Sequence, residues 1–448
     1  MEISVFKEEL FRQGLLAGFT EMEIFVTSAR DFSVRVFKKE IDNYSLSEVW
    51  GLGFRGKYQG RMGYAYTEIP DQQSVTLLIK DAKQNAIIID STDDIEIFAG
   101  SNTYPKIEAF NPDFSNISVA DKIEFALNLE QEAYSLDPRV TTVNYALFAD
   151  GEGEVHIANT KGLDRSYQRN GGASYVSVVV KDEDEVRTAG RFVVGNKWEC
   201  FNVAELAKEA VEEAVSMLGA QTIDSKEYPV ILRHDVAGGI LQTFSSVFSA
   251  ESVQKGFSLL KDKIGETIAA QTITLIDDPL LPDGAGSAPF DSEGVATKTK
   301  EVIKDGVLIT YLHNLKTAKK DGIPSTGNAS KGSFRSPVRI APTNFFIQPG
   351  DLSYDELMAD LDEGLIIISV QGLHSGANPV SGDFSLGAYG YYVKNGKIDH
   401  PVDQITIAGN FFQLLKDVTR IGSDLKFGMG GSTASPSILI KGLAVSGK

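Results

Sequence analysis

The residues of this chain that could do metal or hydrolytic chemistry are few, and the histidines come first. There are five, namely His156, His234, His313, His374 and His400. Catalytic zinc takes three protein ligands, and the helical motif H-E-x-x-H supplies two of them together with a carboxylate base. The segment that begins at His234 follows this motif in outline only, because Asp235 stands at the glutamate position and no histidine comes three, four or five residues later. A structural histidine at the start of a helix is therefore the expected role of His234.

Nucleophilic and phosphate-binding patterns have even less support. No G-x-S-x-G elbow of a serine hydrolase occurs in the sequence. Cys200 is the only cysteine and follows Trp198 near a predicted strand end, where packing is its expected role. Two glycine-rich stretches, 284–286 and 428–431, lack the Lys-Ser/Thr of a phosphate-binding loop and are expected to be ordinary loops.

Charged residues cluster in one stretch of the second half. Four acidic residues lie in this stretch, namely Asp277, Asp278, Asp291 and Glu293. Their spacing is not that of an EF-hand, so we expect them to lie in solvated loops and keep calcium binding as the weaker alternative. Three lysines lie among acids and predict a solvated hairpin edge; they are Lys298, Lys300 and Lys304.

The composition limits the classes of protein to consider. A chain of 448 residues with 42% hydrophobic content suits two domains, and 42 glycines favour many turns. The net charge of −18 argues against direct contact with nucleic acid. A single cysteine fits a reducing compartment. Residues 1–19 are charged and amphipathic, and apolar runs such as 365–368 are too short for a membrane span, so a cytoplasmic protein without membrane contact is expected.

Periodicity predicts the elements that must position these residues. An amphipathic helix is expected within residues 1–19, then short strands at 23–27, 33–37, 49–55 and 63–67, and helices at 72–86 and 118–136. Ser118 with Asp121 and Asn202 with Glu205 have helix-capping spacing. A second run of strands is expected at 140–150, 154–159, 173–181 and 188–194.

The second half carries stronger turn signals. Asp305-Gly306 and Asn395-Gly396 each lie between alternating segments and predict hairpins. Ser353 and Glu356 are expected to cap a short helix before a strand at 365–371. We therefore predict an α+β protein with two domains, 1–222 and 223–448, each with a mostly antiparallel sheet and packed helices.

Several motifs of the second half, in this order, resemble those of the TldD/PmbA family, also called proposed modulators of DNA gyrase. They are PFDSEGVAT at 289–297, KDGVL at 304–308, YLHN at 311–314, STGNA at 325–329, GANPVSGDFS at 376–385 and ITIAGN at 405–410. Order and spacing agree from about residue 229 to the C-terminus. The first half is similar more loosely, through its strands and the segment GLGFR at 51–55.

The resemblance implies a metallopeptidase built from two types of subunit. A TldD-like subunit carries an H-E-x-x-x-H helix and a C-terminal cysteine that hold zinc or a similar divalent ion, and a PmbA- or TldE-like subunit lacks them. Aligned with this pattern, the present chain keeps His234, has Asp235 for glutamate and Gly239 for the second histidine, and has Phe427 near the cysteine position. These four positions are then a vestigial metal site without a metal of its own.

The function expected from the resemblance is a non-catalytic subunit of a heteromeric metallopeptidase that degrades unfolded or small peptides. Its partners would be a TldD-like paralogous subunit and a peptide, with a homodimer as an option in isolation. His313, Asn314, Asn328 and His374 are candidate residues of a substrate groove. Two alternatives stay open: a regulatory protein that binds DNA gyrase itself, and an enzyme of altered chemistry that uses His234, His313 or His374.

Overall fold

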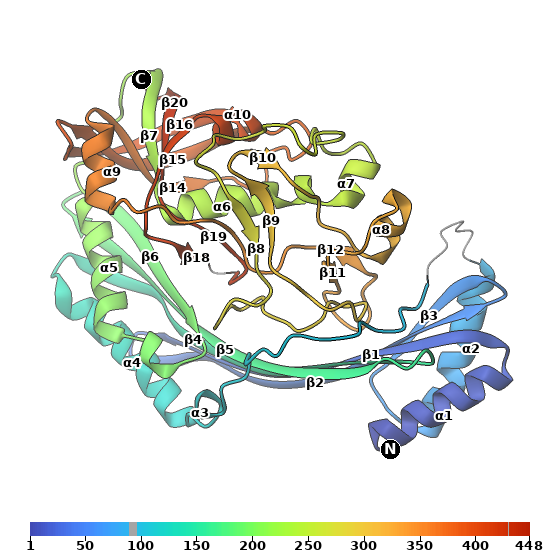
Figure 1. Ribbon diagram of the computed structural model, residues 1–448. Coiled ribbons are helices and arrows are strands. Elements are labelled where there is room, and N and C mark those ends of the chain that lie inside the picture. The colour runs from blue at the N-terminus through green and yellow to red at the C-terminus, as the bar shows by residue number, and fades with distance from the viewer. Residues whose placement is uncertain (89–95, 429) are drawn as a thin grey trace.

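A computed structural model of the chain describes residues 1–88, 96–428 and 430–448. The predicted α+β class is confirmed, with helices packed on mostly antiparallel sheets. Figure 1 shows a long curved sheet below and the second half of the chain above it. The long sheet has the strand order β3-β2-β1-β4-β5-β6. Its strands are β1 (Phe19–Phe37), β2 (Glu40–Tyr58), β3 (Arg61–Thr67), β4 (Val140–Asn159), β5 (Asp164–Asp182) and β6 (Glu185–Gly195).

The central strands of this sheet are much longer than the sequence pattern predicts. The two strands expected at 23–27 and 33–37 are one strand of 19 residues, paired with β2 and β4 along nearly all of its length. The strands expected at 140–150 and 154–159 are likewise the single strand β4. Aspartate and glycine residues in the middle, such as Asp31 and Gly151, suggested turns, but they lie where the sheet has no helix over it and lines a cavity instead.

Helices cover the two ends of the long sheet and leave its middle bare (Figure 1). At one end α1 (Ile3–Leu16) and α2 (Gln72–Ile88) pack on a core that includes Phe6, Leu10 and Phe54. The apolar residues of α1 and α2 recur at helical spacing, so each helix presents one apolar face to the strands. At the other end α3 (Pro112–Ser115), α4 (Val119–Leu136) and α5 (Val203–Ser216) cover a second core.

The predicted capping residues are confirmed. Ser118 accepts a hydrogen bond from the backbone N–H of Asp121 at the start of α4, and Asn202 accepts one from Glu205 at the start of α5. Between β6 and α5 lies a 3-10 helix, Trp198–Cys200. The expectation that Cys200 packs in the interior is wrong, because its side chain is exposed on this turn.

The second half is built around another six-stranded sheet, in the order β16-β15-β14-β7-β20-β17, in which β14 and β7 are parallel and the other neighbours antiparallel. Helix α6 (His234–Phe244) packs against it because Val236, Ala237, Ile240, Leu241 and Phe244 recur on one face. The strands of this sheet are β7 (Lys226–Leu232), β14 (Gly364–Gln371), β15 (Asp383–Lys394), β16 (Lys397–Asn410), β17 (Val418–Ile421) and β20 (Ile438–Ser446).

Smaller sheets and short helices complete the second half. One sheet has the order β10-β9-β8-β13-β19-β18, and β11 pairs with β12. These strands are β8 (Leu275–Asp277), β9 (Lys300–Lys304), β10 (Val307–Leu308), β11 (Ala329–Ser330), β12 (Arg339–Ile340), β13 (Phe345–Ile347), β18 (Lys426–Phe427) and β19 (Thr433–Ser435). The helices are the 3-10 helix Ser245–Phe248, α7 (Ala250–Gln254), α8 (Leu315–Asp321), α9 (Tyr354–Leu361) and α10 (Phe411–Lys416).

The predicted turns of the second half are also confirmed. Asp305 and Gly306 join β9 to β10 with φ of 47° and 81°, and Asn395 and Gly396 join β15 to β16 with φ of 51° and 67°. Two consecutive left-handed residues give a hairpin turn whose twist matches that of the strands. Ser353 and Glu356 form a complete capping box at the start of α9.

The two halves meet in several places, and two of these contact zones lie well apart along the long sheet. In the first zone, near α5 and β6, Glu213 binds Arg233 and Arg187 binds Asp403. In the second zone, Phe334 lies against Gly51 and Gly53 of β2, which pair with Thr27 and Phe25 of β1. Glycine is required at position 51 of β2, because a Cβ atom there would lie 2.2 Å from the Phe334 ring. The strands of the long sheet come from residues 19–195 alone and those of the other sheets from residue 226 onward, and the split at 222/223 stays a prediction.

Among the residues described, no helix is long and apolar enough to span a membrane.

Candidate functional site

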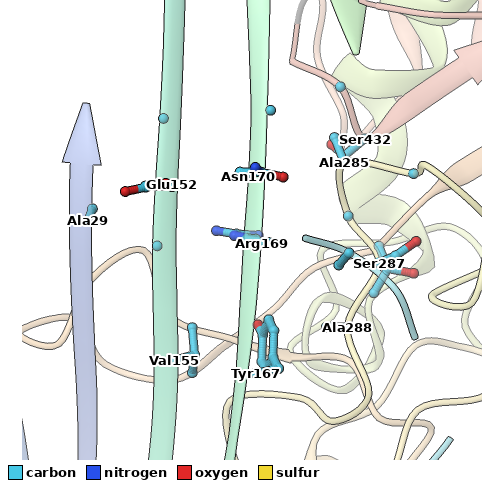
Figure 2. Close-up of a pocket in the computed structure, with 18 of the residues that line it drawn as sticks. Ala29, Glu152, Val155, Tyr167, Arg169, Asn170, Ala285, Ser287, Ala288 and Ser432 are labelled. Atoms are coloured by element: carbon cyan, nitrogen blue, oxygen red, sulfur yellow. The ribbon is translucent and has the colours of Figure 1, made fainter. Parts of the chain in front are cut away.

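A cavity of about 1120 Å3 lies between the bare middle of the long sheet and the loops of the second half. Its floor includes many small residues on neighbouring strands, such as Ala29, Ala149, Gly151, Gly153 and Gly171. Figure 2 shows β1, β4 and β5 on one side and the loop that carries Ala285, Ser287 and Ala288 on the other. These small residues leave space between the sheet and the loops, which larger side chains such as Tyr167 and Arg169 fill only in part.

The charged side chains that line the cavity are mostly acidic. Among the described lining residues there are ten glycines, and seven carboxylates outnumber two basic side chains. The two basic residues are Arg169, on β5, and Lys331, on the loop after β11. The carboxylates are Asp31, Glu108, Asp150, Glu152, Glu154, Asp283 and Asp291. A ligand with basic groups would therefore be favoured over an acidic one.

A buried cluster of charges lies at one end of the cavity and joins the two halves. Arg55 of β2 donates from Nε to Glu23 Oε1 at 2.7 Å, and its Nη1 lies 3.8 Å from Glu293 Oε1. All three side chains are at most 4% exposed. The prediction of a solvated acidic loop is wrong for Glu293 and Asp291, because both are buried against the long sheet.

Burial changes the proton affinity of this cluster. Burial raises the pKa of Asp291 to about 7 although the backbone N–H groups of Glu293, Val295 and Ala329 donate to its carboxylate. Burial also raises the pKa of Glu293, against the opposing effect of Arg55. Burial, together with Arg55, lowers the pKa of Lys331 to about 8. The Lys331 ammonium lies 4.5 Å from the centre of the Phe25 ring, which partly compensates for lost hydration.

The raised pKa of Asp291 makes the stability of the protein depend on pH. An unfolded aspartate has a pKa near 3.9, so the contribution of Asp291 is fully present below about pH 4 and is lost as pH rises through about 7. Between pH 5 and pH 8, we expect the wild type to lose on the order of 2 kcal/mol more unfolding free energy than Asp291→Asn does. Urea unfolding at the two pH values measures this difference.

The matched control is Asp283→Asn, because Asp283 also lines the cavity but its side chain is 49% exposed. This variant should keep the pH dependence of the wild type. If Asp291→Asn also keeps it, the carboxyl group of Asp291 titrates in the folded protein as it does in the unfolded chain.

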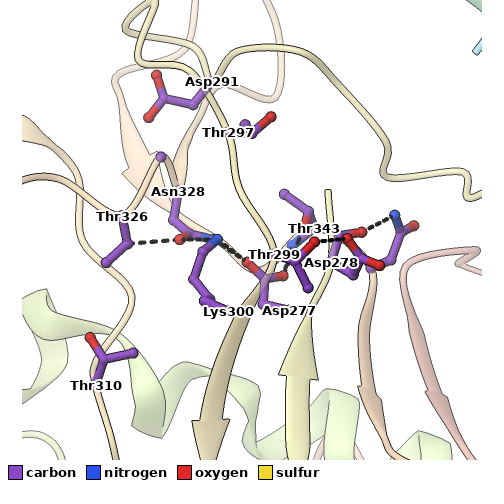
Figure 3. A network of polar contacts seen from close by, with 12 residues as sticks. Asp277, Asp278, Asp291, Thr297, Thr299, Lys300, Thr310, Thr326, Asn328 and Thr343 are labelled. Atoms are coloured by element: carbon purple, nitrogen blue, oxygen red, sulfur yellow. Dashed lines mark hydrogen bonds and ion pairs between the residues drawn. The ribbon is translucent and has the colours of Figure 1, made fainter. Parts of the chain in front are cut away.

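A second buried network, shown in Figure 3, holds the strands and loops above the cavity together. Asp277 is fully buried on β8, and its Oδ2 accepts hydrogen bonds from Lys300 Nζ and Asn328 Nδ2, each at 2.7 Å. Its Oδ1 accepts from the backbone N–H and the hydroxyl of Thr343. The prediction of a solvated hairpin edge is wrong for Lys300, whose side chain is 6% exposed, whereas Lys298 and Lys304 are exposed.

The vestigial metal positions lie at the start of α6 and beside it. His234 begins the helix, and its Nδ1 is 3.3 Å from Asp424 Oδ2. Burial alone would raise the pKa of Asp424, but hydrogen bonds from His234 and Ser437 lower it to about 2. Asp235 is held by Arg233, whose Nε and Nη2 donate to its two oxygens at 2.8 and 2.6 Å. Its carboxylate is thus committed to an arginine and is not placed to act as a base on water.

The remaining two positions supply no metal ligand. Gly239 lies on α6 with no side chain, and a Cβ built there would contact only Leu373, at 3.4 Å. Phe427, on β18, lines the cavity and packs against Phe346 with ring centres 6.0 Å apart. Within the described residues, no group of three or more His, Cys, Asp or Glu side chains could hold a metal ion. The donor set at this place therefore does not fit a catalytic divalent ion, which takes three protein ligands.

The four candidate groove residues occupy different environments. Asn328 lines the cavity and belongs to the Asp277 network. His313 is fully buried without a hydrogen bond to either ring nitrogen, and burial lowers its pKa, which favours the neutral ring. Asn314 caps α8. His374 is exposed on the turn after β14 and lies outside the cavity lining. Only Asn328 of the four is placed to contact a cavity ligand, and the groove assignment stays a prediction.

The two remaining histidines lie apart from the cavity. His156 on β4 has its Nε2 2.7 Å from Asp164 Oδ1, and His400 on β16 has its Nδ1 2.7 Å from Asp399 Oδ2. The glycines at 284 and 286 line the cavity, whereas Met429 of the stretch 428–431 lies outside the described residues. The floor residues escape sequence reasoning because their only signal is small size in the middle of long strands.

Three domain models of one family match the chain in succession. Residues 22–86 match the PmbA/TldA metallopeptidase domain 1, residues 112–218 the central domain, and residues 225–447 the C-terminal domain. Two similar proteins are a metalloprotease PmbA homolog of Haemophilus influenzae and the metalloprotease PmbA of Escherichia coli O157:H7. The first is 30% identical over 95% of this chain and 92% of its own length, the second 26% identical over 94% and 92%.

Two crystal structures have the same fold. A proposed modulator of a DNA gyrase from Thermotoga maritima is 34% identical, with a TM-score of 0.92 over 99% of this chain and 100% of that one. TldE from Thermococcus kodakarensis is 24% identical, with a TM-score of 0.90 over 99% of this chain and 100% of that one.

Proposed function

This chain belongs to the PmbA/TldD metallopeptidase family, and we propose that within it the chain is a non-catalytic subunit of a heteromeric peptidase. Its partner would be a TldD-like paralogous subunit that carries an intact H-E-x-x-x-H helix and binds zinc or a similar ion. Such a metal lowers the pKa of a bound water and polarises the scissile carbonyl. The substrates would be unfolded or small peptides, and the assembly would act in the cytoplasm.

The observation that carries this proposal is the state of the vestigial metal positions. His234 is paired with Asp424, Asp235 with Arg233, and the other two positions are Gly239 and Phe427. One imidazole beside one carboxylate gives a divalent ion too few ligands to compete with water. The water that would attack a peptide bond therefore has to be activated by another subunit.

The role that we propose for the cavity is to hold part of the peptide. Its floor of small residues leaves room for an extended chain, and its excess of carboxylates favours segments with lysine or arginine side chains. Arg169 and Asn170 reach the same space from β5 and could hydrogen-bond a peptide backbone.

The test is a cleavage assay with an unfolded basic peptide and zinc. The chain alone should give no cleavage, and the co-purified pair with the paralogous subunit should give cleavage that a chelator abolishes. The control pair carries glutamine for the catalytic glutamate of the partner and should be inactive. Chelator-sensitive cleavage by the chain alone would contradict the proposal, and so would full activity of the partner without it.

One observation favours a second function, regulation of DNA gyrase through protein contact. The Thermotoga protein, 34% identical to this chain, is described as a proposed modulator of that enzyme. Because the net charge is −18, this chain would bind the gyrase protein rather than the DNA on which gyrase acts. Retention of purified gyrase on the immobilised chain at physiological salt would support it, and no retention would reject it.

A further inference from the structure

Lys331 lines the cavity and carries a positive charge that no carboxylate of the described chain neutralises by direct contact. Within this part of the chain its Nζ forms no ion pair and no hydrogen bond, and it lies 4.5 Å from the centre of the Phe25 ring. Two carboxylates act on its charge, Glu23 and Glu293, but both are paired with Arg55, at N···O distances of 2.7 and 3.8 Å. An ammonium group that has left water without gaining a partner is a place where an anion can bind.

The backbone that carries Lys331 is held by the loop of Asp291 and Ser292. The N–H of Lys331 donates to Ser292 Oγ at 3.0 Å, and the N–H of Ala329 donates to Asp291 Oδ2 at 3.0 Å. The N–H of Ser292 in turn donates to the carbonyl of Ala329 at 3.0 Å. The base of the lysine side chain is thus fixed before a ligand arrives, which lowers the entropic cost of binding.

Aromatic side chains form the wall of the cavity beside this ammonium group. Phe25, Tyr167 and Phe290 line the cavity and belong to one apolar cluster. The rings of Tyr167 and Phe290 meet edge to face, with their centres 5.1 Å apart. A single cation beside an apolar wall fits a ligand that has a carboxylate and an apolar side chain next to each other. The C-terminal residue of a peptide has both.

We propose that Lys331 binds the free C-terminal carboxylate of a peptide in the cavity, and that the last side chain of this peptide packs against the aromatic wall of Phe25, Tyr167 and Phe290. This inference rests on the proposed role of the cavity in holding a peptide. It adds the substrate class, which is peptides with a free C-terminus and an apolar or aromatic last residue. The carboxylates elsewhere in the lining would contact basic side chains farther from the C-terminus.

Calorimetric titration with two peptides tests the site in the chain by itself. Both have the sequence Ala-Lys-Ala-Lys-Phe with an acetylated N-terminus, and one ends in a free carboxylate, the other in an amide. The wild type should bind the free acid at least about tenfold more tightly, because a charge-assisted hydrogen bond in a partly dry site is strong. Equal affinity for the two peptides would overturn the proposal.

Two variants and the pH assign the preference to one residue. Lys331→Met should bind both peptides as the wild type binds the amide, whereas Lys298→Met, at an exposed position outside the cavity lining, should keep the preference. Circular dichroism of both variants checks that they fold.

The pH dependence separates Lys331 from Arg169, the other basic residue of the lining. Burial, together with Arg55, lowers the pKa of Lys331 to about 8, so its charge is lost as the pH rises from 7 to 9, whereas Arg169 and the peptide carboxylate stay charged. Asp291, with a pKa of about 7, and Glu293, whose pKa burial raises, can only gain negative charge as the pH rises. The preference for the free acid should therefore be strong at pH 6.5 and largely lost at pH 9. An unchanged preference at pH 9 would assign the carboxylate to Arg169 and overturn the proposal.

Cleavage by the co-purified pair separates this inference from the proposed function. The pair should cleave the free acid with a lower KM than the amide, and Lys331→Met should raise KM for the free acid only. If the pair cleaves both peptides with the same KM, the peptidase role stands and the Lys331 site is overturned. If the pair cleaves neither peptide while the chain alone still prefers the free acid, the carboxylate site stands and the peptidase role is overturned.

Discussion

Replacing Lys300 by methionine should lower the free energy of unfolding by about 3–5 kcal/mol, the usual cost of leaving one buried charge without its partner. Lys300 is 6% exposed, and its Nζ lies 2.7 Å from Asp277 Oδ2. Methionine fills a similar volume but has no charge. The carboxylate of Asp277 would keep its hydrogen bonds from Asn328 and Thr343 and lose the ammonium group of Lys300 that balances its charge.

The sequence offers a matched control for this substitution two residues away. Lys298→Met removes the same charge from an exposed position and should change the unfolding free energy by no more than about 0.5 kcal/mol. Denaturant unfolding of the two variants beside the wild type gives the comparison. Equal effects at positions 298 and 300 would show that Asp277 does not depend on the lysine for its charge balance.

Replacing Glu213 by alanine should also cost about 3–5 kcal/mol, for a related reason. The side chain of Glu213 is 6% exposed, and it receives the guanidinium groups of Arg191 from its own half and Arg233 from the other half. Without it, Arg233 would keep Asp235 and the carbonyl of Ile368, but two arginines would face each other across the first contact zone. The attraction between the halves there would become a repulsion.

Glu212→Ala is the control, because Glu212 precedes Glu213 on the same helix, is 66% exposed and forms an ion pair with the similarly exposed Lys208 one turn earlier. It should change stability by at most about 0.5 kcal/mol. Limited proteolysis adds a local readout: Glu213→Ala should expose the junction between α5 and β7 to cleavage, and Glu212→Ala should not. If Glu213→Ala behaves as the control does, the contact zone is held by its apolar packing alone.

The parts of the fold that the sequence predicts well are those decided by local chemistry. Ser118, Asn202 and the Ser353–Glu356 pair mark helix starts because their side chains satisfy backbone N–H groups a few residues away. Asp305-Gly306 and Asn395-Gly396 mark hairpins because both residues of such a turn need positive φ. In each case the interacting atoms lie within a few residues of one another.

The parts that the sequence does not predict are decided by distant partners. Lys300 and Asp291 look like solvated residues until Asp277, Asn328 and the long sheet are placed around them. The middle of β1 looks like a turn because nothing local shows that a cavity, rather than a helix, covers it. For the site, aligned motifs pointed to His234, Asp235, Gly239 and Phe427, but the commitment of Asp235 to Arg233 required the geometry.

The two contact zones also restrict how the two halves can move. If the two halves were in contact at one place only, they could rotate about that contact in any direction. Because they are in contact at two separated places, they can rotate only about the line that joins these places. Here Glu213–Arg233 lies at one end of the long sheet and Phe334 lies farther along it, against the part of β2 that pairs with residues 25–27 of β1. Wide opening about either zone would break the other, so the rotation that remains is about the line between the zones, and we expect a ligand to enter the cavity from its sides.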